Sequence, residues 1–242
     1  MTCDGPSTGA MKASVSRQRF VYCCIVWLVA ACTAPTRTPA APAPNTEELA
    51  IVSDGALAAA RLRDVRSADS TIVVTLRYAT ANNFTGAPLP GYDANRAFLD
   101  RDAAAALGRV QQRARAEGLT LHVFDAYRPV RATLAMVDWC HRTGQDSLLT
   151  AGYIASRSRH NLGAAIDLTI ADAATGADLD MGTPFDTFRA DAHTANASGS
   201  IRERRQHLVR LMQAEGFTNY DQEWWHFSYP VAQPTRFDVP VR

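Results

Sequence analysis

Two short segments of the chain carry side chains suited to metal-ion chemistry. The first holds His160 and Asp167 with Gly163 between them, and the second, near the C-terminus, holds Glu223 and His226. Two imidazoles and one carboxylate are ligands that a catalytic Zn²⁺ uses while a fourth position stays open to water. The residue types therefore favour a catalytic metal site.

Side-chain alternation indicates how these residues could meet. In a strand over residues 164–170, the isoleucine and leucine side chains share one face, which must pack on the core, and Asp167 lies on the other. A turn at Gly163 would fold His160 back over Asp167. The same alternation in the aromatic C-terminal segment allows His226 to meet this pair across neighbouring strands.

Glu223 precedes His226 by three residues, an offset that permits a carboxylate beside the open side of a metal without being a ligand. A base for metal-bound water belongs at such a position. Each residue alone has a commoner structural explanation. An isolated histidine such as His160 is more often a surface or structural residue, Asp167 could cap a turn, and the second segment could be only an aromatic strand end.

The elements that would position these side chains follow from residue patterns. We expect strands over residues 71–79, 119–126, 164–170 and 217–229, and helices over residues 101–117, 129–142 and 200–216. The polar segment 172–199 is long enough to be a loop that covers a site. The predicted fold class is α+β, with one domain over residues 49–242 and a central antiparallel sheet flanked by helices.

Composition excludes some partners. The chain has 242 residues, 47% of them hydrophobic, and a formal net charge of +1. This size suits one sizeable domain, and the absence of a sustained basic stripe argues against nucleic-acid binding. Nothing in the sequence implies a protein partner.

The N-terminal residues 1–32 have the layout of an export signal. Basic residues precede an apolar run over residues 20–31 that is too short to span a bilayer comfortably. The run ends in Leu-Val-Ala-Ala-Cys32, which resembles a bacterial lipobox, so that Cys32 would become the lipidated first residue of the mature protein. The alternative is a simple signal cleaved near Ala31. Either form predicts export to the periplasm or cell envelope, with residues 33–48 as a Thr/Ala/Pro-rich tether.

The motifs together resemble a known family. Ser158-Arg-His-Asn-Leu-Gly-Ala-Ala-Ile-Asp167, followed by Glu223-Trp-Trp-His226, is similar to the signature of the LAS metallopeptidases, a group that includes D-alanyl-D-alanine carboxypeptidases and dipeptidases. Within it, the VanX-like zinc D-alanyl-D-alanine dipeptidases are the nearest match, and the resemblance extends over residues 62–229. The narrower match rests on segments 76–80, 83–86, 125–129, 158–167, 179–186 and 223–227.

The resemblance implies a role for each matched residue and a LAS/hedgehog-like fold. It implies one Zn²⁺ per chain, bound by His160, Asp167 and His226. Glu223 would be the general base and acid, and Arg128 would stabilise the transition state. Ser158 and Asp180 are further candidates, for the carboxylate and the ammonium of the substrate. On spacing alone, Arg128 would instead be a surface arginine before a helix and Asp180 a loop-capping residue.

The implied activity is hydrolysis of D-alanyl-D-alanine to free D-alanine in cell-wall precursor or turnover metabolism. A peptidoglycan D,D- or L,D-carboxypeptidase is an alternative that would need an open groove. A non-catalytic, zinc-stabilised wall-binding module is another, which Glu223 argues against because a structural site has no use for a poised base. Related resistance dipeptidases act in the cytoplasm, so an export signal favours salvage of dipeptides from wall turnover.

Overall fold

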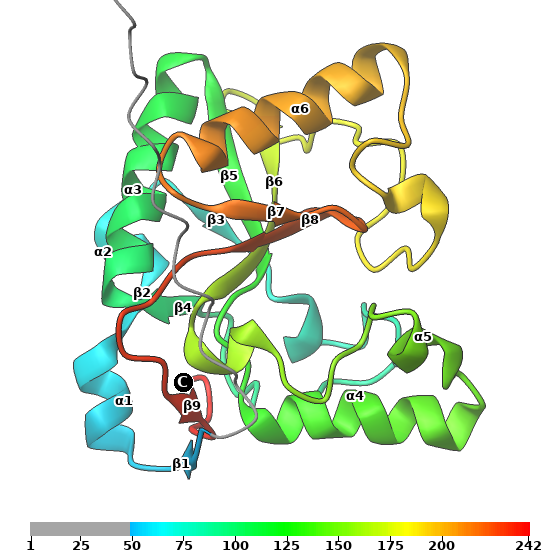
Figure 1. The fold of residues 1–242 in the computed structure, drawn as a ribbon. Coiled ribbons are helices and arrows are strands. Elements are labelled where there is room, and N and C mark those ends of the chain that lie inside the picture. Colours follow the sequence, from blue (N-terminus) through cyan, green and yellow to red (C-terminus); the bar gives the residue numbers. More distant parts are fainter. Residues whose placement is uncertain (1–48) are drawn as a thin grey trace, which may run out of the picture. The chain divides into compact units, whose positions relative to one another are not determined.

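The computed structural model describes residues 49–242, so the predicted signal, lipobox and tether lie outside the described residues. A five-stranded sheet forms the centre of this part of the chain (Figure 1). Its strands, in spatial order, are β3 (Val73–Val74), β5 (Leu119–Asp125), β6 (Ala165–Asp172), β8 (Glu223–Ser228) and β7 (Thr218–Tyr220). Among residues 49–242, no helix combines the length and apolarity needed to cross a bilayer.

The sheet is antiparallel, as predicted, except at one edge. β5, β6, β8 and β7 pair antiparallel, whereas β3 pairs with β5 in parallel. The connection from β3 to β5 contains the long helix α3 (Arg101–Ala116), and a crossover through a helix returns the chain in its original direction. The central sheet is therefore mixed at the β3 edge.

Two short strand pairs lie outside the central sheet. β2 (Leu62–Asp64) pairs antiparallel with β4 (Phe98–Asp100), immediately before α3. β1 (Ile51–Val52) pairs in parallel with β9 (Arg236–Phe237), which joins the start of the described chain to its C-terminal region (Figure 1).

The predicted helices are present with nearly the expected bounds. They are α3, α4 (Val130–Thr143) and α6 (Gly199–Gln213), and Gly118 and Gly144 in left-handed conformation follow the first two. The shorter helical segments are α1 (Gly55–Arg61), α2 (Val65–Ala68), α5 (Ser147–Thr150), η1 (Arg77–Ala79), η2 (Arg159–Leu162) and η3 (Ala190–Ala192).

The strand predicted over residues 71–79 is much shorter in the structure. Pairing stops after Val74, and the chain turns into η1. The backbone N–H of Leu76 donates to the side-chain oxygen of Asn95 at 2.8 Å in place of a strand partner. This turn buries Tyr78, which is 2% exposed, on the side of the sheet that carries Asp167.

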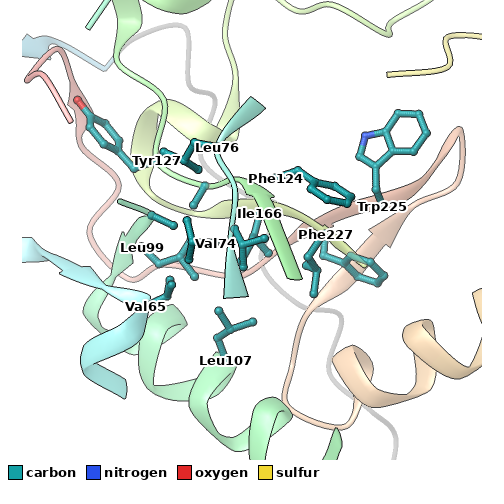
Figure 2. Packing of buried hydrophobic residues seen from close by; sticks show 14 of the residues in the cluster. Val65, Val74, Leu76, Leu99, Leu107, Phe124, Tyr127, Ile166, Trp225 and Phe227 are labelled. Carbon is teal, nitrogen blue, oxygen red and sulfur yellow. The ribbon is translucent and has the colours of Figure 1, made fainter. Parts of the chain in front are cut away.

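The core lies between the sheet and the helices α3 and α6. Ile166, Leu168 and Ile170 of β6 are completely buried, as alternation predicted. Figure 2 shows Ile166 and Phe227 packed in one cluster with Leu107 of α3. The apolar face of β6 therefore anchors the sheet, and the opposite face is left to the polar residues of the candidate site.

Candidate active site

The turn that precedes β6 places His160. In η2, the Ser158 hydroxyl accepts a hydrogen bond from the backbone N–H of His160, and Gly163 ends the turn with a φ of +64°. A Cβ atom at Gly163 would lie 2.6 Å from Cδ2 of Leu62 and 2.8 Å from the backbone nitrogen of Asp100. Both the backbone angle and the close packing require glycine here, so the predicted turn at Gly163 is confirmed.

Three side chains converge at the ends of β6 and β8. Asp167 and His226 are direct cross-strand partners, and His160 reaches them from η2. Their candidate ligand atoms all lie within 4.8 Å of one another. Nε2 of His160 is 3.4 Å from Oδ2 of Asp167 and 3.2 Å from Nδ1 of His226, and that nitrogen is 2.9 Å from Oδ1 of Asp167.

These separations suit a tetrahedral metal ion. Ligand atoms about 2.0–2.2 Å from Zn²⁺ lie about 3.3–3.6 Å from one another in a tetrahedron, close to the spacing around Nε2 of His160. Nδ1 of His160 lies 2.6 Å from the backbone oxygen of Ala126 and, as the donor, would leave Nε2 free for a metal. Burial lowers the pKa of His226, which favours the neutral imidazole that a metal needs.

Asp167 is held in its charged form despite its burial. Burial by itself would raise the pKa of this carboxyl, but the adjacent imidazoles of His160 and His226 lower the pKa well below its usual value. One carboxylate and two imidazoles provide the donor set of a catalytic zinc site.

Glu223 lies beside the three converging residues. Its side chain is buried, and Oε2 is 3.8 Å from Nδ1 of His226, outside the group of ligand atoms. Burial raises the pKa of Glu223 well above its usual value, and the nearby carboxylates of Asp167 and Asp186 raise it further. A carboxylate with a raised pKa can both accept and return a proton near neutral pH.

Arg128 is buried, so its interpretation as a surface arginine is wrong. The residue is 8% exposed, and Nε and Nη2 donate to Oδ2 of Asp125 at 3.0 and 2.8 Å. The Tyr92 hydroxyl donates to the other oxygen of Asp125. Nη2 of Arg128 is also 3.8 Å from Oδ2 of Asp167. Asp125 fixes the guanidinium next to the converging ligands. An aspartate at the end of β5, three residues before Arg128, is the sequence signal that could have indicated a buried arginine.

These side chains line one cavity of about 280 Å³. Its lining includes all but one of the sequence-predicted site residues, together with Tyr78, Trp225 and Asp186. The predicted residues in it are Arg128, Ser158, His160, Asp167, Glu223 and His226.

Asp180 is the predicted residue that the structure does not bring to this cavity. Its side chain is exposed, and its carboxylate accepts a hydrogen bond from the backbone N–H of Gly182 at 2.8 Å and lies 3.9 Å from Nη1 of Arg204. This is the loop-capping arrangement that spacing alone left open. The assignment of Asp180 to the substrate site is therefore corrected, because Asp180 does not line the active-site cavity.

Asp186, six residues further along the same loop, lines the cavity instead. Its Oδ1 accepts a hydrogen bond from the Tyr78 hydroxyl at 2.9 Å, while Oδ2 is buried and has no partner among residues 49–242. Burial raises its pKa well above the usual value. Asp186 has a φ of +60°, a left-handed conformation that turns the chain at this point. A buried carboxylate oxygen without a partner is suited to receive a hydrogen-bond donor from a ligand.

Comparisons with known proteins show which chains this one resembles. A family model described as D-ala-D-ala dipeptidase matches residues 58–240. A D-alanyl-D-alanine dipeptidase of Streptomyces coelicolor is 36% identical over 68% of this chain and 90% of its own length. Proteins of the same name from Enterococcus faecium and Escherichia coli are 33% and 35% identical, over 69% and 66% of this chain and 91% and 79% of their own lengths.

The turn at Gly163 can be tested with a matched glycine. Gly176 also has a positive φ, +73°, but a Cβ atom there would meet nothing within 4 Å. Gly176→Ala should lower the free energy of unfolding by about 1–2 kcal/mol through backbone strain, and Gly163→Ala by about 1–3 kcal/mol more through the clash. Urea denaturation of the two variants measures the difference, and equal losses would contradict a packing requirement at Gly163.

Proposed function

Since the chain belongs to the D-Ala-D-Ala dipeptidase family of peptidases, we propose that it hydrolyses D-alanyl-D-alanine to free D-alanine. The observation that carries the proposal is the convergence of three metal-ligand atoms beside Glu223 in a small cavity. The reaction adds water across the single peptide bond of the dipeptide, so that the carbonyl carbon gains a hydroxyl and the leaving nitrogen gains a proton.

We propose that His160, Asp167 and His226 hold one Zn²⁺ per chain. A bound Zn²⁺ supplies Lewis acidity and lowers the pKa of a bound water to about 7. The fit of the ligand spacing to a tetrahedral ion and the open cavity beside it support this assignment. His160 and Asp167 are nearly completely buried, which protects the site from competing ligands.

Glu223 is the general base and then the general acid in this proposal. Its raised pKa lets it take a proton from the attacking water and return it to the amine that leaves. Arg128 stabilises the negative charge that develops on the carbonyl oxygen, because Asp125 holds its guanidinium in place before substrate arrives.

The two ends of the dipeptide would be held by different groups. Asp186 accepts the substrate ammonium on its unpartnered Oδ2, the role that sequence reasoning had given to Asp180. The Ser158 hydroxyl accepts from the N–H of His160, so its own proton is free to donate to the substrate carboxylate. A longer peptide would place an uncharged amide against Asp186, which favours a dipeptidase over a carboxypeptidase.

We also propose that the protein is exported and held at the cell envelope by lipid on Cys32, and that it salvages dipeptides released by wall turnover. This part of the proposal rests on the sequence of residues 1–32.

The role of Glu223 predicts a specific kinetic loss. Glu223→Gln keeps the size of the side chain but removes the proton acceptor, so kcat for release of D-alanine from D-Ala-D-Ala should fall by about 10²–10⁴-fold. Bound zinc, measured by elemental analysis, should stay at one ion per chain. Glu203→Gln on the exposed side of α6 is the control and should keep full activity. Loss of zinc together with activity would instead make Glu223 a metal ligand.

The proposed binding of the substrate ammonium by Asp186 predicts different effects of substitution at Asp186 and at Asp180 in the same loop. Asp186→Asn should reduce kcat/KM for D-Ala-D-Ala by about 10–100-fold, because a charge-assisted hydrogen bond is lost. Asp180→Asn should leave kcat/KM unchanged. The wild-type protein should not cleave N-acetyl-D-Ala-D-Ala or a peptidoglycan pentapeptide. Cleavage of those blocked substrates would identify a carboxypeptidase, and no cleavage of any substrate by zinc-loaded protein would favour a binding module.

The lipid anchor predicts labelling at one cysteine. Cells that express the full chain and are fed an alkyne analogue of palmitate should label the wild-type protein and the Cys140→Ser variant, but not Cys32→Ser. Cys140 is completely buried, which makes it a suitable control. An unlabelled wild-type protein whose mature N-terminus begins after Ala31, as read by mass spectrometry, would support the simple export signal.

A further inference from the structure

A second hollow lies beneath the loop that carries Asp180. Its volume is about 370 Å³, and none of its lining residues lines the active-site cavity. The floor is formed by β5 and β6, and the outer wall by residues 178–185. Asp178 is one of the lining residues, and its carboxylate lies 2.7 Å from Nδ1 of His122. The hollow is therefore separate from the active-site cavity.

Thr169 lies in the floor of this hollow with an unpaired hydroxyl. It follows Asp167 by two residues on β6, so the two side chains share a face of the sheet. The residue is 1% exposed, and its Oγ1 has no hydrogen-bond partner anywhere in residues 49–242. Buried hydroxyls are normally paired in proteins, so an unpaired one that faces a hollow indicates a partner supplied from outside the chain.

Arg77 offers a second set of donors to the same hollow. Its guanidinium carbon lies 4.9 Å from the centre of the Phe124 ring, and within residues 49–242 it forms no ion pair. Its Nε is buried and likewise unpaired in that part of the chain. A guanidinium edge and a hydroxyl together match the acceptors of a carboxylate.

The rim of the hollow carries the opposite charge. The side chains of Asp178 and Asp180 line it and are 37% and 73% exposed. These carboxylates disfavour a ligand with two negative groups and attract an ammonium. Phe124, Phe185 and Trp224 add apolar surface to the lining. The arrangement is therefore complementary to a small molecule that carries both a carboxylate and an ammonium.

We propose that this second hollow binds a zwitterionic α-amino acid, with its carboxylate on Arg77 and Thr169 and its ammonium toward Asp178 and Asp180. The site is assigned independently of the proposed function, because it uses other residues. A ligand in the hollow would nevertheless contact Phe185, which lies next to the active-site cavity. Phe185 lines the hollow, packs 6.0 Å from the ring of Tyr78, and directly precedes Asp186.

Trp224 and Trp225 line different sites, although their rings lie 5.3 Å apart. Trp224 lines the second hollow and Trp225 the active-site cavity, while Trp139 lines neither. The Trp224 indole N–H donates to the Thr183 hydroxyl in the outer wall of the hollow, so it should report occupancy there. Its signal can be followed by nitrogen-15 NMR of the zinc-loaded full chain during titration with D-alanine.

Titration with D-alanine should shift the Trp224 indole signal saturably and leave that of Trp139 unchanged. Thr169→Val, which keeps the side-chain shape, and Arg77→Gln should each weaken this binding by about tenfold or more. Thr143→Val, at an exposed helix position, is the matched control and should bind as the wild type does. Because the rings of Trp224 and Trp225 lie 5.3 Å apart, the titration is repeated in Asp186→Asn. The Trp224 shift should persist there with the affinity of the wild type, so failure of the proposed function would not mimic failure of this site.

Three results would overturn the proposal. They are a Trp224 signal that does not move, a Trp224 shift that is the same in Thr169→Val and Arg77→Gln as in the wild type, and acetate or ethylamine binding as tightly as D-alanine. The last result would show that one charged group is enough and that no zwitterion is recognised.

Discussion

Burial of several carboxylates in one region constrains the whole site. Asp125, Asp167 and Glu223 are all buried, and charges of one sign cannot be buried together without compensation. Arg128 provides part of that compensation through its two hydrogen bonds to Asp125. A bound metal cation would provide the rest at Asp167, and Glu223 is left with the raised pKa that a proton carrier needs.

A short stretch of backbone around β6 and β8 brings the site residues together. The β6–β8 register puts Asp167 opposite His226, and the left-handed turn at Gly163 returns His160 over both. Nδ1 of His160 also contacts the backbone oxygen of Ala126, which directly follows β5. Arg128 lies two residues further along the same segment. Metal ligands, proton carrier and guanidinium thus all depend on the ends of three adjacent strands, which a packed core supports from the other face.

The sequence predicts the structure where apolar and polar residues alternate. It does not predict the structure where contacts between residues far apart in the chain determine the backbone conformation. Alternation along β6 and the glycine before it were enough to predict the meeting of His160 with Asp167. The turn that buries Tyr78 could not be predicted, because it depends on a hydrogen bond from Leu76 to Asn95, nineteen residues away. The choice between Asp180 and Asp186 likewise depends on the folded loop, because both lie in the matched segment 179–186 and only Asp186 lines the cavity.

The pairing of β1 with β9 has a consequence for how this fold can be joined to other chains. Ile51 lies opposite Arg236, so the two ends of the described region leave it at neighbouring points (Figure 1). Domains whose ends adjoin tolerate insertion into a host protein and circular permutation, because neither operation stretches the chain. A short linker between the two ends, with new termini opened at the exposed turn around Gly176, would preserve every strand that holds the metal ligands. The catalytic region is therefore suited to transplantation as a unit.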